Sequence, residues 1–335
     1  MKKLFLPILS LAVLTVGCNT QTGPRQFSYA GPAQGSTYSV LVKTTEDPQL
    51  KAGIDSILLA MDQSMSLWVP SSLLSKINSG DTNVRIDRAF YDVLEVSQNA
   101  HLASKGLFDP TIGPLVAAWG FSYKKTSGML DSAVVDSMLP YIGFGKIGFS
   151  RNRVHLPQGM KLDFNAVAQG YTVDQIAQWI TSKGITDYMI EVGGEVIAHG
   201  TNDKGEAWKI GIDKPAHEIQ AERFQAIVSL NNKALATSGN YRKYYVDEAT
   251  GEKYAHTLLP TTGYPVRNNL LSVTIIADDC ATADAMATAS LVMGLDKAKA
   301  FLLDNPHLEG FLIFSDEQGE WQEWYTPGFE AMRKL

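Results

Sequence analysis

The feature that most constrains this chain is an apolar run followed at once by an Ala-rich segment. Leu270 to Ala277 has the composition of a strand, and Asp278 to Ala289 favours a helix because alanine has the highest helix propensity. Asp284 and Thr288 are four residues apart in this segment, so on a helix their side chains share one face, with Cβ atoms about 5–6 Å apart. A carboxylate and a hydroxyl are hard oxygen ligands of the kind that Mg²⁺ accepts while it keeps several waters. The pair therefore indicates a magnesium-binding helix face.

The same residues also fit a purely structural role. Thr282 can cap the N-terminus of this helix, which would place Asp284 in the first turn, where the helix dipole stabilises any carboxylate. Thr288 can donate a hydrogen bond to the backbone carbonyl of Asp284. The pair alone leaves both interpretations open, so the rest of the chain has to distinguish them.

One imidazole lies just upstream of the apolar run. His256 stands beside a Pro-Thr-Thr-Gly turn at residues 260–263. A histidine with an ordinary pKa of about 6.5 can accept a proton from a hydroxyl near neutral pH. With a cation on Asp284 and Thr288, this combination predicts a metal-assisted phosphoryl-type transfer, which depends on charge neutralisation and on an aligned nucleophile.

The N-terminus carries an export signal. A short basic start precedes an apolar run, Leu4 to Val16, which is too short to span a bilayer and is typical of a signal peptide. Gly17-Cys18 then matches a lipobox, with cleavage before Cys18 and lipid on that cysteine. We expect residues 1–17 to be the signal peptide, and residues 18–27 to be the lipidated cysteine and a flexible tether. The mature protein would be a membrane-anchored lipoprotein facing the periplasm or the cell exterior; a secreted soluble protein is the alternative.

Residues 28–335 are expected to form a single globular domain, or two closely packed lobes. The chain is 45% hydrophobic and 19% charged, which is ordinary for a globular protein. Its net charge of −6 argues against a nucleic-acid partner. Once Cys18 is lipidated only Cys280 remains, so no intrachain disulfide can form, and we expect a buried thiol.

Helix-like and strand-like segments are mixed without a repeating β-α-β order, which favours an α+β fold with a mostly antiparallel sheet and packed helices. Helices are predicted at Leu50–Met65, 87–106, 131–139, 171–183 and from residue 296. Strands are predicted at 37–43, 188–192, 208–212, 224–230, 234–237, 270–277, 310–314 and 320–325. A further strand follows residues 193–195 and ends at His199, and a hairpin is expected around 247–251.

Four segments combine glycine with hydrogen-bonding side chains: residues 34–37, 107–113, 163–170 and 193–195. Glycine lets a backbone approach a ligand closely, and small polar side chains supply donors to a phosphate or a ring edge. Each segment alone also fits an ordinary turn, and none has the Walker A or G-x-G-x-x-G pattern. Trp68 offers either a stacking face for a flat ligand or a side chain for the core.

Taken together, these segments resemble the FAD:protein FMN transferase family, the ApbE-type flavin transferases. The resemblance extends from about Gly31 to Leu303. Its pieces are Gly35-Ser36-Thr37; Met65-Ser66-Leu67-Trp68 with Ile77-Asn78; Phe108 to Leu115 with Trp119-Gly120-Phe121; Asp163-Phe164-Asn165 with Gly170-Tyr171 and Asp174; Gly193-Gly194-Glu195; Ala236 to Arg242; His256; Pro260 to Gly263; and Ala283-Asp284 with Thr288. The implied fold is the T-fold-like α+β architecture of that family.

The resemblance implies a transferase that cleaves the pyrophosphate of FAD, attaches FMN to a Thr hydroxyl of a target protein through a phosphoester, and releases AMP. Mg²⁺ would be held by Asp284, Thr288 and the carbonyl of Ala166, with Ala287 at the position of a further ligand in some members. His256 matches the proposed base for the acceptor hydroxyl, so His256 and Asp284 are the implied catalytic residues. Contacts with the flavin nucleotide are implied for Gln34, Trp68, Leu107, Phe108, Asp109, Asp163, Gln169 and Leu258.

The chain departs from the family pattern at three places. Gln34-Gly35-Ser36 replaces a common Met-Gly-Thr, Gln169 replaces a common Lys, and Leu259 replaces a common Asp that would orient His256. Two other functions also fit this sequence. One is a Mg²⁺-dependent FAD pyrophosphatase that gives FMN and AMP with water as the acceptor. The other is a flavin-binding lipoprotein without enzymatic activity.

Overall fold

A computed structural model of the chain describes residues 23–121, 130–215, 223–240, 244–246 and 253–334. The expected signal peptide and Cys18 lie outside these residues, as do Tyr241 and Arg242 and the tip of the expected hairpin around 247–251. The two short strands on either side of that tip, β10 (Tyr244–Val246) and β11 (Lys253–Ala255), pair antiparallel, as the sequence predicts.

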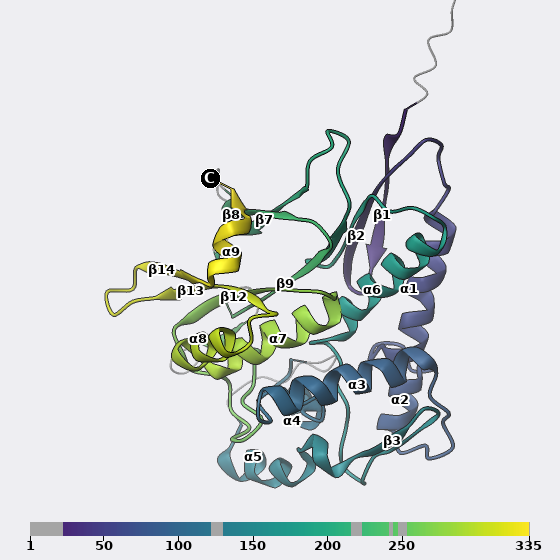
Figure 1. Cartoon of the computed structure of the whole chain (residues 1–335). Helices are drawn as coiled ribbons and strands as arrows, with labels where there is room; N and C mark the ends of the chain where they lie inside the picture. Colours follow the sequence, from purple (N-terminus) through teal and green to yellow (C-terminus); the bar gives the residue numbers. More distant parts are fainter. Residues whose placement is uncertain (1–22, 122–129, 216–222, 241–243, 247–252, 335) are drawn as a thin grey trace, which may run out of the picture.

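An eight-stranded sheet forms the centre of the fold, in the order β1-β2-β5-β6-β9-β12-β13-β14 (Figure 1). Its strands are β1 (Arg25–Ala33), β2 (Ser36–Thr44), β5 (Tyr188–Val192), β6 (Glu195–His199), β9 (Lys233–Gly239), β12 (Leu270–Ala277), β13 (Glu309–Ser315) and β14 (Trp321–Tyr325). Every neighbouring pair is antiparallel, which confirms the predicted α+β class. Because β1 begins at Arg25, the last residues of the expected tether, 25–27, already pair with β2.

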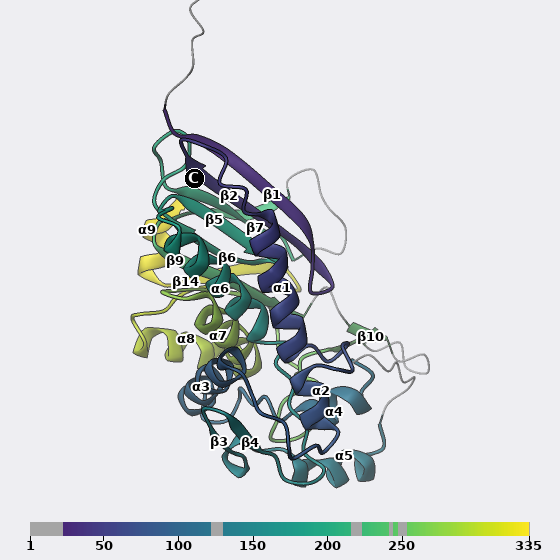
Figure 2. The ribbon, with the colours of Figure 1, turned by 90° about the vertical axis from the view of Figure 1, so that its right-hand side faces the viewer.

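Helices cover one face of this sheet. α6 (Ala168–Ser182) and α7 (Cys280–Met293) pack side by side on that face, with α1 (Lys51–Met65) next to α6 (Figures 1 and 2). α7 also contacts α3 (Arg88–Ala103) and α8 (Leu295–Asp304), so it is enclosed by the sheet and by three helices. A helix that is apolar all round suits such a buried position.

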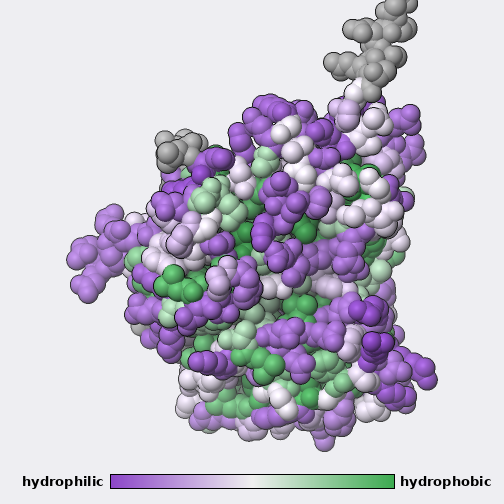
Figure 3. Space-filling view, in the orientation of Figure 1, coloured by the Kyte–Doolittle hydropathy of each residue, from purple (hydrophilic) through white to green (hydrophobic). Residues whose placement is uncertain are grey.

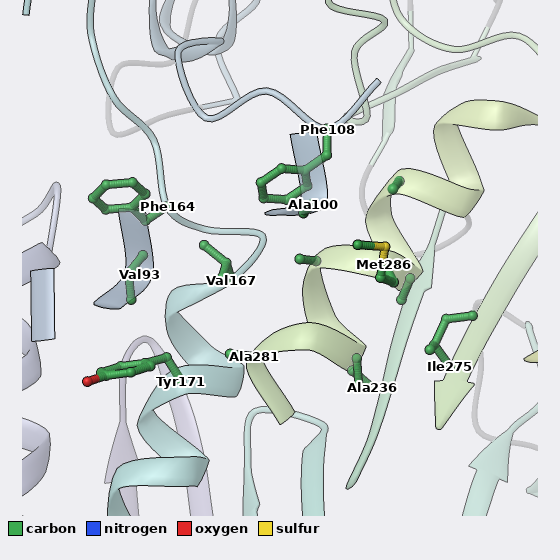
Figure 4. Packing of buried hydrophobic residues seen from close by; sticks show 14 of the residues in the cluster. Val93, Ala100, Phe108, Phe164, Val167, Tyr171, Ala236, Ile275, Ala281 and Met286 are labelled. Carbon is green, nitrogen blue, oxygen red and sulfur yellow. The ribbon is translucent and has the colours of Figure 1, made fainter. Parts of the chain in front are cut away.

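The alanines of α7 explain its central place. Ala281 and Met286 on α7 lie among side chains from the sheet, such as Ala236 and Ile275, and from α3, such as Ala100 (Figure 4). Small side chains let the helix axis come close to its neighbours, and the resulting dense packing is sensitive to any added atom. The Ala-rich segment that most constrains how this chain can fold is therefore also the packing centre of the fold.

A second, three-stranded sheet covers the opposite face of the main sheet. It has the order β15-β8-β7 and contains β7 (Trp208–Asp213), β8 (Phe224–Leu230) and β15 (Arg333–Lys334). Along β12, Ile275 packs toward α7, whereas Ile276 packs toward this second sheet. That alternation is the two-residue period of a strand buried on both faces.

The remaining elements are short. They are α2 (Leu73–Asn78), α4 (Gly113–Ala118), α5 (Ser132–Met138), η1 (Leu139–Tyr141), η2 (Phe144–Lys146), β3 (Gly148–Ser150), β4 (Arg153–His155) and α9 (Pro327–Met332). The predicted helices near 87–106 and 131–139 are confirmed as α3 and α5. In the view of Figure 3 the surface is mostly hydrophilic, with small separate hydrophobic areas. Within the described ranges, no helix combines the length and hydrophobicity needed to cross a lipid bilayer.

Candidate active site

A cavity of about 1320 Å³ opens between the main sheet, the second sheet and the loops below them. Its wall includes the start of α6, one side of α7, the β5–β6 and β7–β8 strands, and the loop segments 107–112 and 256–260. Small-molecule pockets usually have volumes of about 300–1,000 Å³. The cavity is therefore larger than an ordinary small-molecule pocket.

Two carboxylates fix the start of α7. The Asp279 side chain caps the helix by accepting the N–H of Thr282 at 2.8 Å. Thr282 is thus not the capping residue, and the alternative that placed Asp284 in the first turn for that reason is wrong. From α6, Asp174 accepts the N–H groups of Cys280 and Ala281 at 2.8 and 2.9 Å. Free N–H groups at a helix N-terminus are satisfied in this way by side-chain acceptors.

Asp284 lies one turn further along α7, at the contact with α6. Its Oδ2 accepts the backbone N–H of Gly170 at 3.1 Å, and the side chain lines the cavity. Burial raises the pKa of this carboxyl group to about 7. Within the described part of the chain, no Lys, Arg or His forms an ion pair with it. A bound cation would supply the positive charge that a buried carboxylate requires.

The other implied metal ligands divide into two groups. Ala166 and Thr288 line the cavity together with Asp284, and the hydroxyl of Thr288 shares a hydrogen bond with that of Ser238 at 3.0 Å. Of the described residues, Ser238 is thus the partner of Thr288, and the alternative bond to the carbonyl of Asp284 does not form. Ala287 is fully buried in the core and does not line the cavity.

The donor set fits magnesium better than a softer metal. Among the described residues there is no group of three or more His, Cys, Asp or Glu side chains that could hold a metal ion. One carboxylate, one hydroxyl and a backbone carbonyl remain, all of them oxygen ligands. Mg²⁺ is usually bound by one or two carboxylates and keeps several waters and substrate phosphates, so this sparse set suits it.

His256 faces the same cavity from the loop that follows β11. Its ring meets Phe121 edge to face, with ring centroids 6.4 Å apart. Asp284 and Thr288 share helix α7 and the imidazole comes from the loop after β11, and the fold brings all three to one cavity. The candidate base and the candidate cation ligands therefore line one cavity.

All of the residues implied to contact the flavin nucleotide line this cavity. They are Gln34, Trp68, Leu107, Phe108, Asp109, Asp163, Gln169 and Leu258. Trp68 is 58% exposed, so its assignment to the core is wrong and its ring is available for stacking. Asp163 is buried, accepts the N–H of Asn165 at 2.9 Å, and has its pKa raised by burial to about 6.

The carboxylate of Asp109 is hydrogen-bonded to backbone groups of its own loop and of Phe144. Its carboxylate accepts the backbone N–H of Thr111 at 2.8 Å and that of Phe144 at 3.0 Å. The carboxylate is thus committed to holding the loop. An extended network of this kind fixes a binding loop before a ligand arrives.

Gln34 and Gln169 replace side chains that are more common in this pattern. Gln34 has φ of 48° and donates from Nε2 to the hydroxyl of Thr172 at 2.8 Å, while its buried Oε1 has no hydrogen-bond partner among the described residues. That oxygen can accept an N–H from a ligand. The amide of Gln169 lies against Gly193, where a Cβ would be 1.9 Å from Nε2, and Gly193 has φ of 66°. Only glycine suits that position.

The sequence did not single out one wall of the cavity. Lys209 to Asp213 on β7, with Arg223 and Phe224 at the start of β8, line it opposite the loops. In the sequence these residues indicate only strands and carry no motif. The packing of the second sheet on the main sheet brings them to the site. No local pattern could have indicated them.

Comparisons with known proteins agree with this geometry. A sequence model described as the ApbE family matches residues 34–312. A Haemophilus influenzae protein named FAD:protein FMN transferase is 32% identical, and the match covers 100% of this chain and 99% of that protein. The flavin transferase ApbE from Vibrio cholerae has a similar structure, with a TM-score of 0.82 and 28% identity, covering 92% of this chain and 99% of its own. The Pseudomonas stutzeri flavinyl transferase ApbE in its apo form gives a TM-score of 0.83 at 26% identity, covering 92% and 97%.

Proposed function

The chain belongs to the ApbE family, and from that membership we propose that it is an FAD:protein FMN transferase. The observation that carries the proposal is the single cavity that collects Asp284, Thr288, His256 and the eight residues implied to contact the nucleotide. The acceptor is a Thr hydroxyl on a target protein, and the products are a phosphoester-linked FMN and AMP.

The reaction exchanges one phosphorus–oxygen bond for another. The acceptor oxygen attacks the phosphorus on the FMN side of the pyrophosphate, the bond to the bridging oxygen breaks, and AMP leaves with the bridging oxygen. His256 takes the proton of the acceptor hydroxyl, a contribution of about 10²–10⁴ in rate for a positioned base. The atoms balance without an oxidant or a further reactant.

Asp284, Thr288 and the carbonyl of Ala166 are the residues that would hold Mg²⁺. When bound there, the ion supplies positive charge beside the pyrophosphate oxygens. The hydrogen bond from Gly170 holds the Asp284 carboxylate at the cavity wall, so the ligand does not depend on the ion for its position. Preorganisation of this kind is what phosphoryl-type transfer requires.

The rest of the cavity wall provides the groups that would bind the nucleotide. Trp68 offers an exposed ring for stacking, and Gln34 Oε1 offers an acceptor for an N–H at the edge of a base or flavin. The loop braced by Asp109 adds Leu107 and Phe108 to the cavity wall. These contacts orient the dinucleotide without adding a positively charged side chain at residue 169.

We further propose that the enzyme is an exported lipoprotein, anchored by lipid on Cys18 and facing the periplasm or the cell exterior. The sequence of residues 1–18 supports this proposal.

The test is a transfer assay. The purified protein is incubated with FAD, MgCl₂ and a Thr-containing candidate target, and the target is analysed by mass spectrometry. A gain of the FMN phosphoester mass with release of AMP supports the transferase. Free FMN without covalent flavin would indicate the pyrophosphatase, and intact FAD would indicate a carrier.

A further inference from the structure

Strand β7 has an unusual relation to the cavity. Five consecutive residues, Lys209 to Asp213, all line it. Successive side chains of a strand point to opposite faces of its sheet. A run of consecutive residues therefore lines one cavity when the edge of the strand, and not a face, is turned toward it.

The sheet order supports this geometry. β7 is the terminal strand in the order β15-β8-β7, and in the described part of the chain it pairs only with β8. In an antiparallel pair, alternate residues direct their N–H and C=O groups away from the neighbouring strand. Such groups along residues 209–212 face the cavity, and an open strand edge is a template for pairing with another chain.

An aromatic ring covers one face of this edge. Gly211 has no side chain, and a Cβ there would be 2.4 Å from the ring of Phe224. Phe224 is 46% exposed at the cavity, with the guanidinium of Arg223 over its ring at 5.3 Å. Arg223 is itself held by Asp213 at 2.8 Å. The edge is thus bordered by a fixed aromatic surface.

We propose that the β7 edge binds an extended segment of the acceptor protein as an added β-strand, which delivers the acceptor Thr into the cavity containing His256. The inference rests on the proposed function, since it names how that function's second substrate is recognised. Three observations converge on it: the edge opens into the reaction cavity, that cavity exceeds an ordinary small-molecule pocket, and the exposed ring of Phe224 flanks the edge. Strand addition of this kind takes affinity from main-chain hydrogen bonds and specificity from alternate side chains.

The first test uses wild-type protein and backbone-modified peptides. The probe is a synthetic peptide centred on the Thr that gains the FMN mass in the transfer assay. A series of peptides carries one N-methyl group each, at successive residues. We expect kcat/KM to fall about 3- to 10-fold at every second position and to change little at the positions between, because only alternate N–H groups of an added strand meet the edge. No effect, or a uniform effect along the series, would overturn the inference.

The second test asks whether the peptide binds beside β7. Phe224→Ala should raise the KM for the peptide about 5-fold or more and leave the Kd for FAD unchanged. Trp321→Ala is the matched control, since this aromatic residue of β14 is similarly exposed, at 43%, but does not line the cavity. An unchanged peptide KM in Phe224→Ala would place the partner elsewhere. If the wild type transfers FMN but the effect of N-methylation on kcat/KM does not alternate along the peptide, the inference alone is rejected. If no peptide or protein accepts FMN, the proposed function is rejected as well.

Discussion

The carboxylate of Asp284 in α7 accepts a hydrogen bond from the backbone N–H of Gly170 in α6, at 3.1 Å. The two residues are 114 positions apart, and the bond crosses a close contact between the helices. A Cβ at residue 170 would lie 2.4 Å from the carbonyl oxygen of Cys280 and 2.9 Å from the Cβ of Asp284. Helix packing thus fixes the carboxylate that we propose as the metal ligand.

This contact predicts the effect of Gly170→Ala. The added methyl group must push α6 and α7 apart, so we expect the free energy of unfolding to fall by about 1–3 kcal/mol, together with weaker Mg²⁺-dependent FAD binding. Urea unfolding and FAD titration measure the two effects. Gly145→Ala is the control, because no heavy atom lies within 4 Å of a Cβ at that position. Equal unfolding free energies and equal FAD affinities in the two variants would show that α6 and α7 accommodate the added methyl group without cost.

The base assignment predicts that His256→Ala separates chemistry from binding. The single-turnover rate of flavin transfer should fall about 10²- to 10⁴-fold, while the Kd for FAD remains close to that of the wild type. His307→Ala is the control, since His307 is exposed and does not line the cavity. A transfer rate near the wild-type value in His256→Ala would refute the assignment.

Asp174 predicts a specific pH dependence of stability. Burial raises the pKa of its carboxyl group to about 7, although the N–H groups of Cys280 and Ala281 act in the opposite direction. A raised pKa means that the folded state binds a proton that the unfolded state has released. The free energy of unfolding should therefore fall as pH rises from about 4 to about 7, with a limiting slope of about 1.4 kcal/mol per pH unit from this group.

Asp174→Asn removes that titration. Urea unfolding at several pH values between about 4 and 7, with EDTA present, should show a weaker loss of stability with pH in the variant than in the wild type. The variant is also expected to be less stable throughout, because an amide replaces one of the two oxygens that accept N–H groups from α7. Identical slopes would contradict a raised pKa at Asp174.

The anchor proposal predicts the behaviour of the two cysteines. Cys18→Ser should move the protein from the membrane fraction to the soluble fraction, because lipid attachment requires the thiol. Cys280→Ala should remain in the membrane fraction, since this thiol is fully buried in the fold. Fractionation followed by immunoblotting measures both. Membrane attachment of Cys18→Ser would require a different anchor.

The sequence predicts those features that depend on neighbours along the chain. An apolar strand run and an Ala-rich helix are local patterns, so β12 and α7 are found where expected. The cap of α7 is harder to assign, because Asp279 and Thr282 are both good capping residues, and the bonds in the folded helix select Asp279. The exposure of Trp68 likewise depends on where α1 ends relative to the cavity.

Contacts between distant segments could not be predicted from one sequence. The bond from Gly170 to Asp284 and the approach of Gln169 to Gly193 depend on how helices and turns meet in the fold. The β7 wall depends on which strand ends the second sheet. Asp284, Gln169 and the two glycines can be singled out in the sequence and β7 cannot, but in each case only the three-dimensional packing shows what the residues contact.

The most direct test of the central claim is the mass of an acceptor protein after incubation with FAD and Mg²⁺, measured for the wild type, Asp284→Asn and Asp278→Asn. Asp278 is the matched control because its side chain is 80% exposed and pairs with Lys233 outside the cavity. We predict a gain of one FMN phosphoester and release of one AMP for the wild type and Asp278→Asn, and a rate at least about 100-fold lower for Asp284→Asn. Equal transfer by Asp284→Asn, or release of AMP and free FMN with no gain in acceptor mass, would contradict the account.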